Sequence, residues 1–261
     1  MLDLTYVSLG AGVQSSALLL ASDRGLWGVP RADVAIFADT QDEPAWVYDY
    51  LKILESVVSI PIHRVTRGRL SEAGPLFLRI PAFTRGADGR AGLTRRQCTS
   101  EYKLVPIIRE VRRLLGQPHP MRVTGVATGL IGISLDEAHR MKPALRRFMR
   151  NSYPLVDARK RRGDCLALIR ELGLPTPKKS ACVFCPYHDD ATWRDLKANH
   201  PTEWLAAVEH DARIRNSKQA GIKRPAFLHR SLVPLAEADL KESHEVQPDM
   251  FGNECEGVCG V

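Results

Sequence analysis

Residues 5–21 read TYVSLGAGVQSSALLLA, and this stretch decides the fold. A β-prone run, Thr5–Leu9, ends in glycines, and Ser15–Ala21 then has the composition of a helix. Three further elements follow in the order strand, helix, strand, over Val34–Ala38, Trp46–Val58 and Ile60–Val65. Because this alternation is typical of parallel sheets with right-handed crossovers, the sequence predicts an α/β domain.

The pattern changes in the second half of the chain. A helix is expected over Lys103–Leu115 and a further strand over Arg122–Thr128. From about Asp157 the sequence reads as helices broken by prolines, and Gln247–Val261 is polar and glycine-rich, which is typical of a tail or flap. We therefore expect an α/β domain over residues 1–156 and a mostly helical, cysteine-bearing C-terminal extension over residues 157–261.

Composition narrows the class of protein. The chain has 261 residues, and 44% of them are hydrophobic, which is enough for a real core. No apolar run approaches the roughly 20 residues that a membrane helix needs, and the first residues resemble no secretory signal. The expected location is therefore the cytoplasm, with no membrane partner. Six cysteines in that compartment indicate metal or redox chemistry rather than a disulfide framework.

Positive charge is clustered in the middle of the chain. The formal net charge is +7, and the clusters are Arg95–Arg96, Arg112–Arg113, Arg146–Arg147 with Arg150, and Arg159–Arg162. Such clusters attract polyanions, nucleic acid above all. A solvated basic surface, or arginines that bind the phosphates of a single nucleotide, would give the same pattern.

The glycine-rich turn after the first strand favours phosphate binding. Gly10 and Gly12 let the backbone approach a phosphate, the start of the next helix supplies N–H groups, and Ser15 and Ser16 add hydroxyls. The turn lacks the lysine of a Walker A loop, and a plain strand–helix turn is the alternative. Asp39 and Thr40 follow the second strand at the edge where open α/β sheets bind ligands. Asp39 would suit Mg²⁺ or a nucleotide there, or it would cap a helix.

Three cysteines have the spacing of a metal site. Cys98 stands alone, whereas Cys182 and Cys185 form a Cys-x-x-Cys turn followed by Pro186. Three thiolates suit zinc with one further ligand, or a [4Fe–4S] cluster with one open iron. The alternative is that these residues are small buried hydrophobes. Among weaker candidates, His188 can ligate zinc but is expected to have a surface or hydrogen-bonding role, and Cys165, Trp193 and Trp204 are expected in the core.

These motifs together resemble the PP-loop superfamily of adenine-nucleotide α-hydrolases, and specifically its phosphoadenylyl-sulfate reductase branch. The resemblance runs over about residues 5–190, through Ser8–Ser16, Ile36–Gln41, Gln97-Cys98-Thr99-x-x-x-Lys103-x-x-Pro106, Gly132-x-x-x-Asp136-Glu137-x-x-Arg140 and Ser180-x-Cys182-x-x-Cys185-Pro186. It implies a doubly wound, five-stranded parallel sheet that binds ATP and Mg²⁺. The nucleotide residues that it implies are Ser8, Gly10, Gly12, Gln14, Ser15, Ser16, Asp39, Thr40, Gly132 and Arg140.

The cysteine pattern separates two branches of that superfamily. Iron–sulfur adenylyl-sulfate reductases carry a Cys-Cys pair before the lysine, whereas here Thr99 follows Cys98. Three cysteines of this kind resemble the ATP pyrophosphatases that insert sulfur into nucleic acid. That resemblance implies a [4Fe–4S] cluster on Cys98, Cys182 and Cys185, and a cysteine desulfurase as sulfur donor. The implied acceptor is nucleic acid, with DNA phosphorothioation preferred over tRNA thiolation.

The end of the chain keeps a second function open. Reductases of this superfamily end in Glu-Cys-Gly, and this chain ends in a similar but doubled segment with Cys255 and Cys259. Gln14 stands where ATP pyrophosphatases have an aspartate, and reductases tolerate glutamine there. The alternative is therefore a phosphoadenylyl-sulfate or adenylyl-sulfate reductase that releases sulfite with thioredoxin. In either case Cys255, Cys259 and Asp39 are the expected catalytic residues. The sequence leaves open the acceptor, the sulfur donor, the kind of metal and the oligomeric state.

Overall fold

The structure, a computed structural model, describes residues 3–72, 80–86, 89–215 and 224–240. Within the described residues, two compact units are present. Of the described residues, unit 1 contains those from Asp3 to Arg67 and from Ser100 to Ser180, and unit 2 contains those between Gly68 and Thr99 and between Ala181 and Leu240. No helix in the described ranges is both long and apolar enough to cross a membrane.

Unit 1 is built on a five-stranded parallel sheet, which confirms the predicted fold class. The strand order is β3-β2-β1-β6-β7, and every neighbouring pair is parallel. The strands are β1 (Asp3–Leu9), β2 (Val34–Asp39), β3 (Ile62–Thr66), β6 (Val126–Ile131) and β7 (Met149–Ser152). β6 begins four residues later than the expected Arg122–Thr128, because the buried residues of this segment are Ala127 and Gly129–Ile131.

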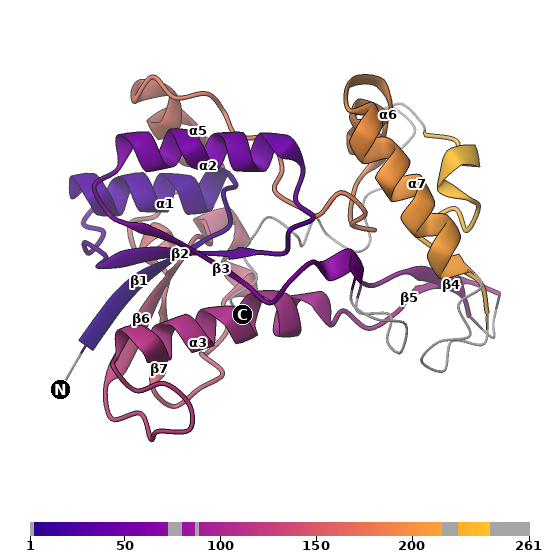
Figure 1. Ribbon diagram of the computed structural model, residues 1–261. Coiled ribbons are helices and arrows are strands. Elements are labelled where there is room, and N and C mark those ends of the chain that lie inside the picture. The colour runs from indigo at the N-terminus through magenta and orange to yellow at the C-terminus, as the bar shows by residue number, and fades with distance from the viewer. Residues whose placement is uncertain (1–2, 73–79, 87–88, 216–223, 241–261) are drawn as a thin grey trace. The chain divides into compact units, whose positions relative to one another are not determined.

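Helices cover both faces of this sheet (Figure 1). One face packs against α1 (Val13–Arg24), α2 (Ala45–Val57) and α5 (Arg162–Glu171), and the other packs against α3 (Val105–Leu114). Ten consecutive residues of α1, from Val13 to Ser22, are buried, as expected of a helix enclosed on several sides. A short helix, α4 (Pro154–Asp157), precedes α5.

The position of α5 explains why the two units do not follow the expected boundary between residues 156 and 157. Cys165, Leu168 and Ile169 on α5 are buried in the same core cluster as Leu18 of α1. A helix that fills the core of unit 1 belongs to that unit, so unit 1 extends to Ser180. In the sequence, α5 and the later helices all belong to one region of helices broken by prolines. That pattern did not distinguish α5, which lies in the core of unit 1, from the helices that follow.

Unit 2 is partly helical, as expected for the C-terminal region, but it also contains a small antiparallel sheet. Its strands are β4 (Phe83–Arg85), β5 (Ala91–Leu93) and β8 (Ala226–Phe227), in the order β5-β4-β8. Its helices are α6 (Asp190–Asn199) and α7 (Pro201–Arg215). Asp189 caps α6, since its carboxylate accepts a hydrogen bond from the Thr192 N–H at 2.7 Å.

Candidate functional site

The strand order of unit 1 creates a crevice at the carboxyl ends of β1 and β6. The chain passes from β1 to β2 and β3 on one side, and the later strands β6 and β7 lie on the other side of β1. Open α/β sheets bind ligands at this kind of switch point. Gly10 follows β1 and Gly132 follows β6, so both glycines lie at this edge.

The loop after β1 leaves the start of α1 without a side-chain cap. Gly12 is the N-cap residue, and the first turn of α1 contains no acidic side chain. Ala11 adopts a left-handed backbone conformation with φ 57°, which is uncommon for a residue other than glycine. The N–H groups and positive dipole end of α1 therefore remain suited to an anion such as a phosphate.

Ser15 stabilises this loop internally. Its hydroxyl accepts a hydrogen bond from the Gly10 N–H at 3.2 Å and donates one to the Gly12 carbonyl at 3.3 Å. Ser15 and Ser16 are both buried, as is Ser8 at the end of β1. The geometry thus gives Ser15 a role in shaping the loop, in addition to any contact with a ligand.

Gly132 brings the end of β6 against the first turn of α1. A Cβ atom at position 132 would lie 2.8 Å from both Cα and N of Ser15 and 3.1 Å from the carbonyl carbon of Gln14. Such distances are too short for an unstrained contact. Glycine is therefore required at this position by packing.

Gln14 is bound by other protein side chains. It is 1% exposed. Its Nε2 donates to Glu137 Oε2 at 3.2 Å, and its Oε1 accepts from Arg162 Nη1 at 2.9 Å. Arg140 forms an ion pair with the same Glu137 at 3.0 Å. The structure therefore brings together Gln14 and Arg140, both of which the family resemblance implied, and adds Arg162 from the start of α5.

Asp136 connects to the same segment. Its carboxylate accepts the Arg162 N–H, with both oxygens 3.3 Å from that nitrogen. Burial alone would raise the pKa of Asp136, but hydrogen bonds, including this one, hold the pKa below its usual value. Asp136 thus stays ionised and stabilises the start of α5.

Asp39 lies at the carboxyl end of β2 and is held by two hydrogen bonds to one oxygen. Oδ1 accepts the Gln41 N–H at 2.7 Å and the Tyr48 hydroxyl at 2.9 Å. Burial, together with this contact to Asp39, raises the pKa of Tyr48, so Tyr48 remains a donor. Asp39 does not cap α2, since Pro44 is the N-cap of that helix. Thr40, next to it, is fully buried.

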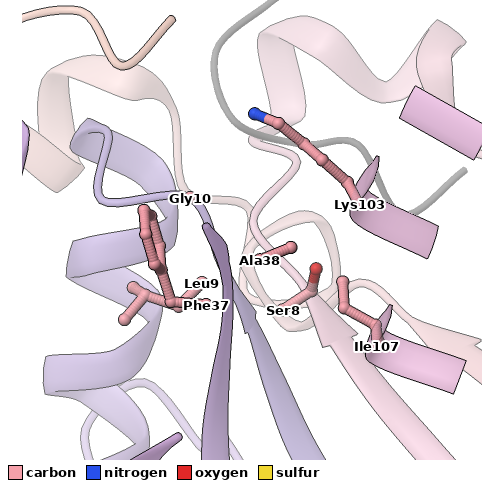
Figure 2. Close-up of a pocket in the computed structure, with 7 residues that line it drawn as sticks. All are labelled: Ser8, Leu9, Gly10, Phe37, Ala38, Lys103 and Ile107. Carbon is pink, nitrogen blue, oxygen red and sulfur yellow. The ribbon is translucent and has the colours of Figure 1, made fainter. Parts of the chain in front are cut away.

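A cleft opens at this edge between the loop and α3 (Figure 2). The space in it and at its mouth, open solvent included, is about 250 Å³. Leu9 and Phe37 line one side, and Lys103 and Ile107 line the other (Figure 2). Lys103 comes from the π-helical segment η2 (Thr99–Leu104). Its Nζ lies 3.3 Å from Oε1 of Glu43, whose side chain is fully buried, so the cleft contains a cation fixed beside a phosphate-type loop.

The Cys-x-x-Cys segment forms a tight turn in unit 2. The Cys182 carbonyl accepts the Cys185 N–H at 2.9 Å and His188 Nε2 at 2.9 Å, and the His188 N–H donates to the Cys185 carbonyl at 3.1 Å. The His188 ring also meets Trp193 edge-on at 4.8 Å. His188 therefore has the hydrogen-bonding role that was expected of it, and it closes the turn.

The three cysteines that the sequence predicts as metal ligands lie in one unit. Cys98, Cys182 and Cys185 all belong to unit 2, and none is in a disulfide. Nevertheless, no group of three or more His, Cys, Asp or Glu side chains in the described ranges is placed to hold a metal ion. Ligation of a cluster by these three cysteines therefore stays a prediction. Cys255 and Cys259 lie outside the described residues.

The remaining residues singled out by sequence have structural roles. Cys165 is fully buried in the core of unit 1, and burial raises the pKa of its thiol to about 12. Trp193 is fully buried, whereas Trp204 is half-buried and meets it edge-on at 6.4 Å. Glu43 and Tyr48 were missed, and the only signal for them was their position shortly after the second strand.

No family model matches the chain, and no curated protein matches it. Among solved structures, the chain is similar to the crystal structure of phosphoadenylyl-sulfate (PAPS) reductase from Candida auris in a phosphate complex. The identity is 12% and the TM-score 0.40, over 69% of this chain and 80% of that chain. At this level, the similarity identifies neither an activity nor a ligand for the chain.

Proposed function

We propose that this chain is a PP-loop enzyme that binds ATP and Mg²⁺ in unit 1, activates an acceptor by adenylation and transfers sulfur to nucleic acid, preferably DNA and otherwise tRNA. The observation that carries the nucleotide part is the crevice at the β1–β6 switch point. The uncapped start of α1 follows the loop at this edge, and Gly10 of the same loop lines the cleft that contains Lys103, whose ammonium lies beside Glu43. The sulfur part rests on the three-cysteine pattern and on Thr99.

The residues of unit 1 suit the activation step. The N–H groups at the start of α1 would bind phosphate oxygens, and Lys103 would neutralise charge on them. Asp39 would bind Mg²⁺ through Oδ2, because Oδ1 already accepts two hydrogen bonds. An oxygen of the acceptor would attack the α-phosphate of ATP and expel pyrophosphate. A persulfide delivered by a cysteine desulfurase would then displace AMP through its outer sulfur, and a second cysteine thiol would cleave the resulting S–S bond, so that one sulfur stays on the acceptor and the two cysteines end as a disulfide.

A [4Fe–4S] cluster on Cys98, Cys182 and Cys185 is part of the proposal, but no step above depends on it, because the described residues do not group these thiols around a common centre. When bound, such a cluster with one open iron would supply a site for sulfide. Protein prepared anaerobically should contain about four irons per chain. Stoichiometric zinc without iron after anaerobic reconstitution would refute the cluster.

One observation favours the reductase alternative. Gln14 occupies the position where ATP pyrophosphatases have an aspartate, and its amide is bound to Glu137 and Arg162. An amide held in this way is a poorer Mg²⁺ ligand than a free carboxylate. A reductase would bind a sulfate nucleotide in the same crevice without cleaving ATP.

Two assays separate the alternatives. The first supplies ATP, Mg²⁺, a cysteine desulfurase with cysteine, and either DNA or tRNA, and measures pyrophosphate and ³⁵S in the nucleic acid. The second supplies phosphoadenylyl sulfate or adenylyl sulfate with thioredoxin and measures sulfite. Asp39→Asn should abolish pyrophosphate release, while Asp49→Asn, an exposed site on α2, should not. Robust sulfite release with no pyrophosphate would establish the reductase instead.

The C-terminal cysteines are proposed as a sulfur relay. Replacing Cys255 and Cys259 with serine should leave nucleotide binding and iron content unchanged while abolishing transfer from a protein donor. Loss of metal in this variant would show instead that the two thiols are ligands.

A further inference from the structure

A second cleft in unit 1 lies next to the one in Figure 2 and shares Ser8 and Ile107 with it. It is shallow, and the space in it and at its mouth, open solvent included, is about 340 Å³. Ile107 and Ile108 of α3 form one wall, and Leu145 contributes to another. Tyr6 and Asn151, on strands β1 and β7, also line it. An apolar cleft with a few polar groups is the usual form of a small-molecule or nucleobase site.

The floor of this cleft depends on Gly129. Tyr6, Gly129 and Asn151 occupy one row across β1, β6 and β7. A Cβ atom at position 129 would lie 2.6 Å from the Tyr6 hydroxyl oxygen, so the phenol lies across β6 in the space that the glycine leaves. Tyr6 is buried, and burial raises its pKa, so it stays a neutral phenol. It provides an uncharged aromatic surface.

Asn151 supplies a fixed polar group. Its Nδ2 donates to the Lys142 carbonyl at 3.0 Å and contacts the Tyr153 hydroxyl at 3.4 Å. The Lys142 carbonyl can only accept a hydrogen bond, so the atom of the Asn151 amide that contacts it must be the NH₂ nitrogen. This contact therefore fixes the orientation of the Asn151 amide. Oδ1 therefore remains able to accept a hydrogen bond from a ligand, such as the amino group of a nucleobase.

Residues 141–150, which we call the basic loop, border the cleft. Lys142, Arg146, Arg147 and Arg150 are exposed, and within the described part of the chain no ion pair involves them. The loop is held at its start, where the Lys142 N–H donates to the Tyr153 hydroxyl at 2.9 Å, and at its end, where the Met149 N–H donates to the Arg146 carbonyl at 2.9 Å. Leu145, between these cations, is 68% exposed.

We propose that one nucleobase extruded from a nucleic acid strand packs at the open mouth of this cleft, while the basic loop binds the flanking phosphates. Four exposed cations on the segment that borders an apolar cleft match a polyanion that carries flat apolar groups. Extrusion would place the nucleotide, with its base and its phosphodiester, beside Ser8 and the nucleotide cleft. The inference rests on the proposed function, because it assigns a place to the acceptor.

Binding by the basic loop can be tested without ATP or sulfur, so the result is independent of the proposed chemistry. Fluorescence anisotropy would measure the affinity for labelled DNA and RNA over a range of salt concentrations. Arg146→Glu with Arg147→Glu should reduce the slope of log K against log salt by about 1.5 to 2, as expected for two lost phosphate contacts. The control, Arg24→Glu with Arg170→Glu, makes the same charge change at exposed residues of α1 and α5 and should leave the slope unchanged. Equal effects of the two variants would refute the proposal.

Base insertion needs a separate readout. DNA and RNA containing 2-aminopurine should become more fluorescent on binding, because the base leaves its stack. Leu145→Asn should raise the concentration at which this signal is half-saturated by about tenfold, because it removes an apolar contact with the base, and should leave the salt slope intact. Leu205→Asn, at a residue that is 60% exposed on α7, is the matched control. Tight binding without a rise in 2-aminopurine fluorescence would refute base insertion. Binding to anionic lipid vesicles as tight as binding to DNA or RNA would refute nucleic acid as the partner. The DNA and RNA arms show which strand is preferred.

Discussion

Replacing Gly132 with alanine tests how the nucleotide crevice is built. The new Cβ would lie 2.8 Å from Cα and N of Ser15, whereas ordinary contacts begin at 3.4 Å, so the two segments must separate by about 0.6 Å. Overpacking of this kind costs about 1–3 kcal/mol. The Gly→Ala change also restricts the unfolded chain, which raises the free energy of unfolding by about 0.4–1 kcal/mol. We therefore expect Gly132→Ala to lower the free energy of unfolding by about 1–2 kcal/mol.

Gly163→Ala is the matched control. Gly163 lies in α5 of the same unit, and a Cβ there meets nothing within 4 Å. Since alanine favours a helix over glycine, this variant should be more stable by about 0.5–1 kcal/mol. Urea denaturation followed by circular dichroism would measure both variants.

The same two variants should differ in nucleotide binding. Displacing the end of β6 moves the first turn of α1, whose N–H groups are proposed to bind phosphate. Calorimetric titration with ATP should therefore show weaker binding for Gly132→Ala and unchanged binding for Gly163→Ala. If Gly132→Ala matches the control in both stability and affinity, the close approach does not constrain the site, and this reasoning is wrong.

Three further predictions concern buried groups. Lys103→Met should lower the free energy of unfolding by about 3 kcal/mol, because it removes the cation from buried Glu43; adding Glu43→Gln should recover part of the loss in urea denaturation. Because burial raises the pKa of Cys165 to about 12, mass spectrometry should find it alkylated by iodoacetamide only after unfolding. Burial, with Arg213 beside it, lowers the pKa of His210 in the folded protein to about 3, whereas a histidine in the unfolded chain has a pKa of about 6.5. Between these two pH values the unfolded chain therefore binds a proton that the folded protein does not bind. Stability should fall as pH drops from about 6.5 towards 3, and His210→Gln should flatten that dependence in urea denaturation at several pH values; an unchanged profile would contradict the assignment.

Local sequence predicted the elements that position the nucleotide crevice. Apolar runs of strand length and the glycines after Leu9 predicted β1, β2 and the loop into α1, and the structure has them there. The expected Lys103–Leu115 helix appears as a π-helical turn followed by α3. These features are encoded by neighbouring residues, so their pattern is visible without the fold. The alternatives for the cysteines were not decided in this way, because ligation depends on segments far apart in the chain.

What the sequence by itself determined is the order of strands and helices, and through it the parallel sheet with a phosphate-type loop at its carboxyl edge. What only the tertiary structure decided is which distant side chains meet there. Gln14 binds Glu137 and Arg162, which are 123 and 148 residues away, and Gly132 is required by the backbone of Ser15. Helical and strand periodicities repeat over a few residues, whereas such contacts arise only after the sheet and α5 have packed, so no local pattern records them.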